Sequence, residues 1–420
     1  MIVPFHVTEM LRRVRAKFAS PGDAGRIAPR TDDFTPLRPV RTATAATVAA
    51  FWDRLARPEA RARLADPQTL ADAALYARNI ENLAGTVKVP VGLAGPLRIN
   101  GVNASGDYIV PLATTEAALV ASYARGALAA TKAGGVSTAV LYEGVLRTPA
   151  FVFDGLLQAG TFVDWVVQNA EALKAAAEAT TRYGRLVSLE PAIDTNIVFL
   201  LCRYTTGDAA GQNMVTIATH ALCEHIAARC PVRPARWYVE GNFSGDKKAS
   251  SLGTMTGRGR KVSASVILPA AVVRGTLFTT PAAMLDYARV ANLGALLSGQ
   301  LGAQAHYANG LAALYIATGQ DAACVAESAV GFTRMEPRGE DLFCSVTMPN
   351  ILVGSVGGGT GLPSQKAALD ILGLAGPGHG AALAEVAAAL CLCGEISIVA
   401  AMAAGHFTRA HQSLARGRKA

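Results

Sequence analysis

Residues 381–405 read AALAEVAAALCLCGEISIVAAMAAG and form the most apolar stretch of the chain. Two carboxylates, Glu385 and Glu395, interrupt it, and an ionised carboxylate is costly inside a lipid bilayer. We therefore predict that this stretch forms a buried helix in a large protein core rather than a membrane span. At the other end, residues 1–19 mix apolar side chains with arginine and lysine, which fits neither a signal peptide nor a span. We expect a soluble protein.

The composition is that of a folded protein with more than one domain. The chain has 420 residues, of which 51% are hydrophobic and 17% are charged, so it is too apolar for a disordered protein and too long for one ordinary core. The formal net charge is +8, but the basic residues are scattered and no nucleic-acid-binding motif accompanies them. A basic surface that attracts phosphate-rich small molecules explains this charge equally well, and we expect no nucleic-acid partner.

The seven cysteines indicate neither a metal site nor a disulfide framework. They are odd in number, lie in apolar segments, and include no pair or Cys/His cluster with the spacing of a zinc site. We expect reduced, buried thiols and no bound metal.

Local sequence patterns predict an α+β fold. Apolar residues recur at helical spacing within 46–77, which predicts a helical N-terminal region. Residues 148–239 alternate strand-like runs with helical ones, as is typical of a compact α+β domain. The run 87–97 is rich in Pro, Gly and Val, which predicts short extended pieces and turns. Beyond these, the apolar run 262–268 predicts a strand that leads into long helical segments.

Four segments place charged or titratable side chains in apolar or glycine-rich surroundings, where an unused charge is costly. They are PLATTEAALVAS (111–122), GNFSGDKKAS (241–250), ATGQDAA (317–323) and AAGHFTRAH (403–411). Each alone has an ordinary explanation. Glu116 could complement the dipole at a helix start, the DKK turn could be solvated, and a histidine near the chain end could lie on the surface.

Two further segments contain closely spaced glycines, GDAAGQNM (207–214) and VGGGTGL (356–362). Glycines ahead of a helix allow backbone N–H groups and the helix N-terminus to approach a phosphate. Neither segment is a dinucleotide fingerprint or a P-loop, so by spacing alone either could be an ordinary tight turn.

Taken together, the segments resemble the 3-hydroxy-3-methylglutaryl-CoA (HMG-CoA) reductases, because eight of them occur in that family's order. They are ENLAG (81–85), PVGLAGPL (90–97), ATTEAALVAS (113–122), GDAAGQNM (207–214), DKK (246–248), GQDAA (319–323), VGGGTGL (356–362) and AAGHFTRAH (403–411). The resemblance spans Ala77 to Arg416 and is closer to the eukaryotic and archaeal class than to the degradative bacterial class. It implies a cytoplasmic enzyme that uses NADPH to reduce an acyl-CoA thioester, with HMG-CoA giving mevalonate and free CoA.

The resemblance also implies a role for each charged motif. Lys247 matches the lysine that stabilises oxyanion character on the reacting carbonyl. Glu116 matches the acid that protonates the aldehyde, which requires burial and a neighbouring carboxylate to raise its pKa. Asp321 matches the aspartate that is hydrogen-bonded between that glutamate and lysine. His411, rather than the preceding His406, matches the histidine that protonates the departing CoA thiolate.

Binding residues follow by the same resemblance. It places substrate and CoA contacts at Ser122, Arg125, Arg147, Glu240, Asp246, Lys248, His306, Asn309 and Ser397. It places cofactor contacts at Thr181, Arg182, Asp208, Gly211, Asn213, Met214, Gly358, Thr360 and Arg416. Arginines near the adenosine favour NADPH over NADH, because a 2′-phosphate needs a charged partner.

The architecture implied by the resemblance is α+β with a helical N-terminal region (1–84). A helix-rich large CoA and substrate domain (85–147 and 240–416) would contain an inserted small ferredoxin-like NADP-binding domain (148–239). The segment 411–420 would be a C-terminal flap that closes over the cofactor. The family builds its active site at a dimer interface, so we expect a homodimer or tetramer and no membrane contact.

The chain departs from the family pattern around the distal carboxylate of HMG. Glu240 stands where a serine is usual, and two desolvated carboxylates would repel each other by several kcal/mol. A second lysine of the family falls near Arg289 or Val290. Two other exchanges, at Gln212 and Ala249, are expected to be neutral.

Three interpretations remain open. HMG-CoA remains the substrate if Glu240 is turned away or paired with Lys248 or Arg147. Another acyl thioester, with a neutral or cationic tail, would be reduced if Glu240 faces the substrate. A non-catalytic binding protein is disfavoured, since it would not need four costly polar groups.

Overall fold

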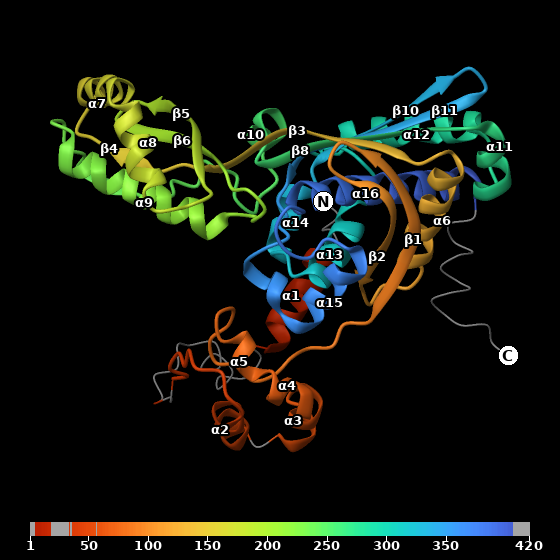
Figure 1. Cartoon of the computed structure of the whole chain (residues 1–420), viewed down its shortest axis with the longest axis horizontal. Coiled ribbons are helices and arrows are strands. Elements are labelled where there is room, and N and C mark those ends of the chain that lie inside the picture. Colours follow the sequence, from red (N-terminus) through yellow and green to blue (C-terminus); the bar gives the residue numbers. More distant parts are fainter. Residues whose placement is uncertain (1–4, 18–32, 34–35, 56, 406–420) are drawn as a thin grey trace.

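The computed structural model describes residues 5–17, 33, 36–55 and 57–405 (Figure 1). The fold is mixed α/β. A large sheet with its helices forms the main body, and a smaller sheet with three helices lies to one side of it. The helices of residues 45–76 lie below the main body in the view of Figure 1.

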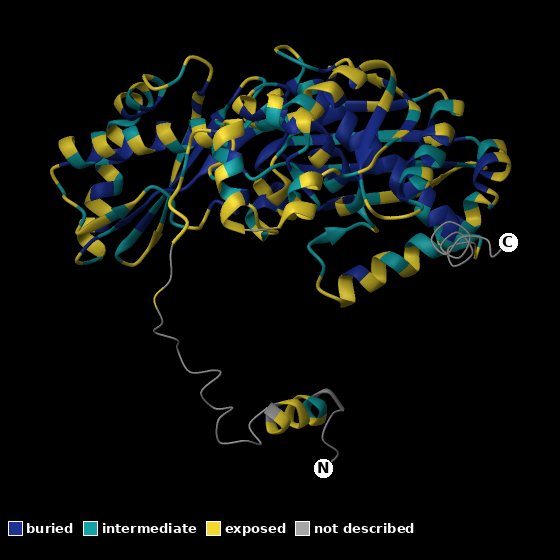
Figure 2. Cartoon of the chain, turned by 90° about the horizontal axis from the view of Figure 1, so that it is seen from below, coloured by how far each residue is buried: buried dark blue, intermediate teal, exposed yellow. Residues whose placement is uncertain are grey.

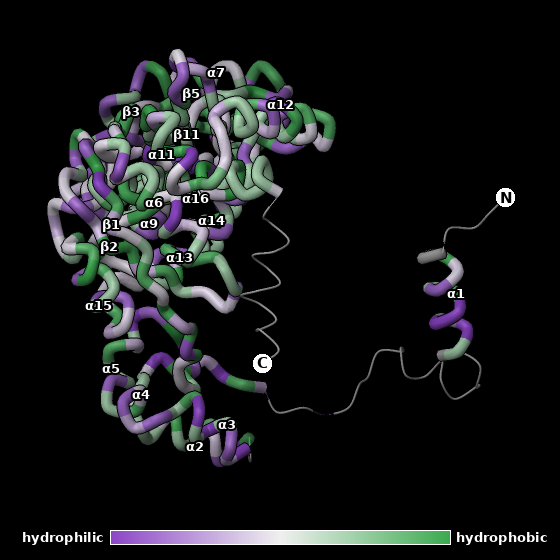
Figure 3. Tube along the Cα trace, turned by 90° about the vertical axis from the view of Figure 1, so that its right-hand side faces the viewer, coloured by the Kyte–Doolittle hydropathy of each residue, from purple (hydrophilic) through white to green (hydrophobic). Residues whose placement is uncertain are grey.

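Short helices make up the described part of the N-terminal region. They are α1 (Phe5–Lys17), α2 (Ala45–Leu55), α3 (Pro58–Leu64), α4 (Pro67–Ala71) and α5 (Ala73–Tyr76). Both α3 and α4 begin with proline, whose fixed φ and missing N–H suit the first helical position. The indole N–H of Trp52 donates to the carbonyl of Ala84 at 2.7 Å and so ties α2 to the chain that enters the main body. Figure 3 shows both hydrophilic and apolar segments on α1, whose apolar side chains include the exposed Met10 and Leu11.

The main sheet is mixed. In spatial order its strands are β2 (Ser105–Ala113), β1 (Val91–Gly101), β3 (Val136–Arg147), β8 (Gly259–Leu268), β11 (Asp341–Ile351), β10 (Gly331–Arg338) and β9 (Gly302–Ala303). Strand β1 runs parallel to β3 and β9 parallel to β10, and the other neighbours are antiparallel. The last residues of β3, Val145 to Arg147, pair with the smaller sheet. One strand thus joins the two sheets and carries Arg147 to their junction.

The smaller sheet lies within residues 148–239. Its strands and helices are β4 (Ala150–Val152), α7 (Leu156–Gln168), α8 (Ala170–Glu178), β5 (Arg185–Asp194), β6 (Ile197–Thr205), α9 (Gln212–Arg229) and β7 (Arg236–Tyr238). Strand β6 pairs with β5 on one side and with β4 and the end of β3 on the other. The ring of Phe162 packs against Phe151 and Phe153 at centroid distances of 4.9 and 4.8 Å, so α7 covers this sheet. The predicted alternation of strands and helices is confirmed here.

The remaining helices accompany the main sheet. They are α6 (Leu119–Lys132), α10 (Ser251–Thr256), α11 (Ala270–Val272), η2 (Val273–Leu277), α12 (Pro281–Leu297), α13 (Tyr307–Thr318), η3 (Ala322–Cys324), α14 (Val325–Ser328), η4 (Gly358–Gly361), α15 (Pro363–Leu372) and α16 (Gly380–Ala403). Figure 2 shows the buried residues concentrated in the strands and helices at the centre of the main body.

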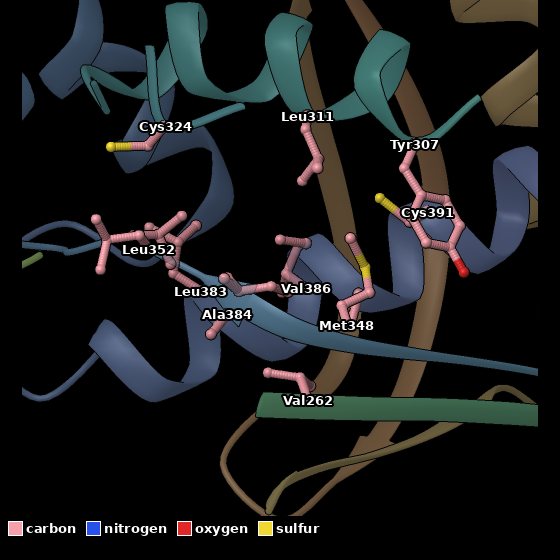
Figure 4. Packing of buried hydrophobic residues seen from close by; sticks show 14 of the residues in the cluster. Val262, Tyr307, Leu311, Cys324, Met348, Leu352, Leu383, Ala384, Val386 and Cys391 are labelled. Atoms are coloured by element: carbon pink, nitrogen blue, oxygen red, sulfur yellow. The ribbon is translucent and has the colours of Figure 1, made fainter. Parts of the chain in front are cut away.

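Helix α16 is the centre of the core. It packs against α6, α12 and α13 and against strands β3, β8 and β11, and Figure 4 shows its side chains between α13 and the sheet. Each large apolar side chain buried there contributes roughly 1.5–3 kcal/mol. By length and composition α16 could span a membrane, but 83% of its most apolar window is buried inside the protein. The prediction of a buried core helix is confirmed.

The two carboxylates of α16 are buried because each accepts several hydrogen bonds. Glu385 accepts the backbone N–H groups of Asn103, Ala104 and Val140 and the hydroxyl of Thr138. A buried carboxylate surrounded by donors avoids most of the cost of losing water. This carboxylate therefore fastens the turn between β1 and β2 to α16.

Two local predictions are correct only in part. The long helical segments expected after residue 268 are interrupted by the β10–β11 hairpin (331–351), and the run 87–97, expected to form short extended pieces and turns, contributes to one long strand, β1, with an irregularity between Ala94 and Leu97. In β11, alternate side chains such as Leu342, Cys344 and Val346 are fully buried. A period of two places one face of this strand on the core, and a helix would have brought polar residues inward.

Candidate active site

A fixed cation lies in the DKK turn between β7 and α10. The ammonium nitrogen of Lys247 is 2.8 Å from Oδ2 of Asp321, and Asp321 also accepts the N–H of Ala323 at the start of η3. The hydrogen bond that Lys247 donates to Asp321 is the main cause that raises the pKa of Lys247. The backbone of Lys247 has φ 58°, in the left-handed region, and its N–H donates to Glu327. This turn thus presents a protonated lysine in a defined position.

Glu116 lies in a turn ahead of α6. Because Ala118 adopts the left-handed conformation, the helix begins only at Leu119. Glu116 is exposed, so the burial expected for it is not found. Oε1 of Glu116 accepts from Asn309 at 3.5 Å, and within the described residues no hydrogen bond joins it to Asp321. Asp321 thus contacts the lysine but not the glutamate.

A cavity of about 710 Å³ opens between α6, α12, α13 and α16. Its wall brings together expected contact residues from distant parts of the sequence, namely Glu116, Ser122, Arg125, His306 and Asn309. Ser397 lies behind this wall, where its hydroxyl oxygen is 2.9 Å from that of Ser122. It also accepts from the guanidinium of Arg125. The cavity is large enough for a slender ligand such as the pantetheine arm of CoA.

Glu395 positions one side of this cavity and was not identified as a site residue from the sequence. Its carboxylate accepts the N–H groups of Ala305 and His306 and the hydroxyl of Thr333. These bonds fix the start of α13, where His306 lines the cavity. The signal that could have found Glu395 is that it is one of two carboxylates in an otherwise apolar helix.

Five charged side chains form an array beside the DKK turn. Arg147 Nη1 lies 3.1 Å from both Glu240 and Asp246, and Arg258 lies 3.1 Å from Asp246 and 2.6 Å from Glu327. Burial opposes ionisation of Asp246, but attraction to Arg258 and Arg147 outweighs it and lowers the pKa. Burial raises the pKa of Glu327 despite Arg258. Arg258 and Glu327, 1% exposed, were missed from the sequence.

Glu240 is held by protein donors. One oxygen accepts from Arg147, and the other accepts the hydroxyl of Thr148 at 2.9 Å. Lys248 is exposed and donates to the backbone oxygen of Asp246. Of the pairings considered for Glu240, the structure therefore contains the one with Arg147. The Nε of Arg147 is buried without a hydrogen-bond partner in the described part of the chain.

No second cation reaches the cavity wall from α12. Arg289 pairs with Asp286 on an exposed surface of this helix, and Val290 is exposed as well. The α12 side chains that line the cavity include Ala288, Ala291 and neighbouring residues but neither of these two.

The two glycine-rich segments lie side by side. A backbone bridge joins Ala209 to Val356, and the N–H of Ser355 donates to the carbonyl of Asp208. Gly211, at φ 80°, ends the loop and begins α9, where a Cβ would lie 2.2 Å from Thr206. Backbone N–H groups at such a helix start suit a phosphate. The segments expected to hold the cofactor are thus brought together.

The residues expected to contact the cofactor make different contacts within the protein. Asp208 accepts the N–H groups of Gly378 and of Gly380, the first residue of α16. Burial opposes ionisation of this carboxylate, but these donors outweigh it and lower its pKa. Thr181 contacts the sulfur of Met214 at 2.9 Å. The other expected contacts lie in the α8–β5 turn, α9 and η4, namely Arg182, Asn213, Gly358 and Thr360.

Some expectations fall on residues outside the described part of the chain. His406, His411, Arg416 and the flap 411–420 all lie within 406–420. All seven cysteines are free and buried, which confirms the expectation of reduced thiols. In the described ranges, no group of three His, Cys, Asp or Glu side chains is arranged to hold a metal ion.

Comparison with known proteins shows the family to which the chain belongs. The family model described as hydroxymethylglutaryl-coenzyme A reductase matches residues 50–416. The chain belongs to this family. The reductase from Aeropyrum pernix is 45% identical over 350 residues, covering 82% of this chain and 83% of the relative. The reductase from Methanothermobacter thermautotrophicus is 41% identical over 342 residues, covering 81% and 86%.

Solved structures show the same fold. A class II HMG-CoA reductase from Streptococcus pneumoniae, bound to NADPH in open conformations, has a TM-score of 0.62 at 18% identity and covers 84% of this chain and 97% of its own. The resemblance inferred from the ordered motifs is confirmed, and the protein is an enzyme of the HMG-CoA reductase type. None of these comparisons favours a different acyl thioester.

Proposed function

We propose that this reductase converts HMG-CoA to mevalonate and free CoA, consuming two NADPH, as a step of the mevalonate pathway. Membership of the family supports the reaction. The observation that carries the assignment to this chain is the 2.8 Å contact between Lys247 and Asp321, because Lys247 directly follows Asp246 of the charged array. Bound NADPH would supply the hydride in each of the two reductions.

The proposed catalytic residues stabilise negative charge on the reacting oxygen and donate protons. Lys247 stabilises the oxyanion that develops on the thioester carbonyl and on the aldehyde, since its charge is fixed before substrate arrives. Asp321 keeps the lysine protonated and in place. Glu116 donates a proton to the aldehyde oxygen, and His411 protonates the departing CoA thiolate. Closure on the substrate is what would bury Glu116, which is exposed here.

Glu240 supports HMG as the acyl group. Because its carboxylate is bound by Arg147 and Thr148, Glu240 does not confront a substrate carboxylate without a cation beside it. Arg147 and Lys248 remain the cations at that end of the substrate. We propose that Asp246 holds Arg147 in place, and that Ser122, Arg125, His306, Asn309 and Ser397 position CoA.

The cofactor binds, in this proposal, along the two adjacent glycine-rich segments. Gly211, Asn213, Met214, Gly358 and Thr360 approach the nicotinamide half, while Asp208 shapes the loop. Thr181, Arg182 and Arg416 surround the adenosine phosphate, and the arginines favour NADPH.

The domain assignment is proposed on the same basis. Residues 148–239 form the small ferredoxin-like NADP-binding domain, inserted into a large domain formed by 85–147 and 240–416. The region 1–84 precedes them, and 411–420 acts as a flap. We also propose a cytoplasmic homodimer or tetramer whose active sites lie between subunits.

A substrate panel tests the proposal. We expect NADPH oxidation with HMG-CoA, and little with acetyl-CoA or with acyl-CoA thioesters that have neutral or cationic tails. Turnover of one of these thioesters in preference to HMG-CoA would show that the acyl group is different. Tight CoA binding without turnover of any thioester would show a binding protein.

A further inference from the structure

Gln212, the first residue of α9, uses both ends of its amide in the charged array. Its Oε1 accepts from Arg147 at 3.2 Å and from Arg258 at 2.6 Å. Its Nε2 donates to Asp246 at 3.1 Å and to the sulfur of Cys324 at 3.6 Å. We expected glutamine here to be a neutral exchange, whereas the structure gives its side chain polar partners in Arg147, Arg258, Asp246 and Cys324.

The contacts require an amide. The amide oxygen accepts from the guanidinium groups of both Arg147 and Arg258, and it adds to Asp246 as a shared acceptor that offsets their mutual repulsion. The amide nitrogen donates to Asp246, which a carboxylate cannot do unless it is protonated. A methionine of similar length offers neither function. Within the described residues, Nη2 of Arg147 donates to Gln212, whereas Nη1 donates to the carboxylates of Glu240 and Asp246.

The position of Gln212 links two loops. It follows Gly211 at the end of the loop 207–214, which carries the proposed cofactor contacts. It contacts Asp246, the residue before Lys247, and Arg147, the proposed substrate contact. A displacement of the loop on cofactor binding would therefore move the acceptor that orients Arg147.

We propose that Gln212 is a positioning residue that couples cofactor binding at the 207–214 loop to the orientation of Arg147 and of the turn that carries Lys247. This inference rests on the proposed function. It makes binding of HMG-CoA and of the nicotinamide cofactor mutually dependent, since coupling between two sites is reciprocal.

The test compares Q212M and Q212E with the wild-type enzyme. Isothermal titration measures the Kd of HMG-CoA with and without NADP⁺, and steady-state assays give KM and kcat. We expect NADP⁺ to tighten HMG-CoA binding about five- to tenfold in the wild type and to have little effect in Q212M. We expect the KM of Q212M for HMG-CoA to rise by a similar factor. Q168M changes an exposed glutamine on α7 whose partner is Asp164, and it should behave as wild type.

Q212E supplies a readout that a purely structural role would not change. Its carboxyl group imitates the amide only when protonated, because it can then donate to Asp246 while accepting from the arginines. Its kcat/KM should therefore recover toward the wild-type value as pH falls, whereas that of Q212M should not. The inference would be overturned if NADP⁺ tightened HMG-CoA binding in Q212M as much as in the wild type. It would also be overturned if the kcat/KM values of Q212E and Q212M changed with pH in the same way. An inactive wild type would instead contradict the proposed function.

Discussion

Lys247 and Asp321 form an ion pair, at 2.8 Å, between two loops that are far apart in the sequence. Asp321 is itself held by the N–H of Ala323, so the acceptor does not move freely. The pairing raises the pKa of Lys247 and keeps its charge in place across the neutral range. A preorganised cation stabilises a developing oxyanion without reorganisation at the moment of reaction.

Asp321→Asn tests the catalytic value of this pair. We expect kcat to fall about 10²- to 10³-fold, as when one oxyanion-stabilising group is lost, with a smaller change in the Kd of HMG-CoA. Asp286→Asn, which breaks the exposed pair with Arg289, is the matched control and should keep its kcat. A kcat of Asp321→Asn within threefold or so of wild type would contradict the role of the pair.

The pair also predicts a pH dependence of stability. The folded-state pKa of Lys247 is raised above its ordinary value of 10.5. Its stabilisation is therefore fully present below pH 10.5 and is lost as pH rises through the raised pKa. The difference in melting temperature between wild type and Asp321→Asn should stay constant at neutral pH and shrink above pH 10.5. A difference that shrinks already near neutrality would show that another group is responsible.

Glu240→Ser tests whether Glu240 orients Arg147 or repels the distal carboxylate of the substrate. If Glu240 orients Arg147, its loss should raise the KM for HMG-CoA by about tenfold, the equivalent of one charge-assisted hydrogen bond. Glu240→Gln keeps an acceptor for Thr148 and should cause a smaller increase. A lower KM in the serine variant would mean that Glu240 repels the substrate carboxylate.

The buried pair Arg258–Glu327 predicts a stability effect. Arg258→Met removes one partner and leaves the other buried, which costs about 3–5 kcal/mol. The double variant Arg258→Met/Glu327→Leu also removes the stranded carboxylate of Glu327 and should recover the part of this loss that it causes, while Asp246 keeps its contact with Arg147. Denaturant unfolding of the single and double variants measures the difference. Equal destabilisation in both would show that Glu327 is not stranded by the loss of Arg258.

Two buried carboxylates of α16 allow a matched comparison. Glu395→Gln places an amide NH₂ against the donors of Ala305 and His306, so it should lower stability and weaken CoA binding. Glu385→Gln creates the same conflict away from the cavity and should lower stability alone. Calorimetric titration with CoA distinguishes them. Equal CoA affinities in the two variants would exclude a positioning role for Glu395.

Local chemistry was enough to predict several elements and residues. The composition of residues 381–405 predicted α16, and the alternation within 148–239 predicted most strands and helices of the smaller sheet. The resemblance of the DKK and GQDAA motifs to the family marked Lys247 and Asp321 as catalytic candidates, and the structure pairs them. The order of the eight motifs along the chain was the signal that indicated the family, because each motif alone had an ordinary explanation.

Other features depend on contacts that no local pattern encodes. Glu116 was expected in the first helical turn, but a left-handed Ala118 delays the helix. Arg258 and Gln212 become significant only once folding places them beside Asp246. Glu327 did have a signal: it is a lone carboxylate in an apolar segment, the same argument that identified Asp321.

Product stoichiometry tests the central claim most directly. With HMG-CoA as substrate, thiol titration of released CoA and the fall in NADPH absorbance can be followed in one reaction. The proposed mechanism predicts two NADPH oxidised for each CoA released, with mevalonate as the product and loss of both signals in Lys247→Met. One NADPH per CoA with aldehyde accumulating, or unchanged turnover in Lys247→Met, would contradict it.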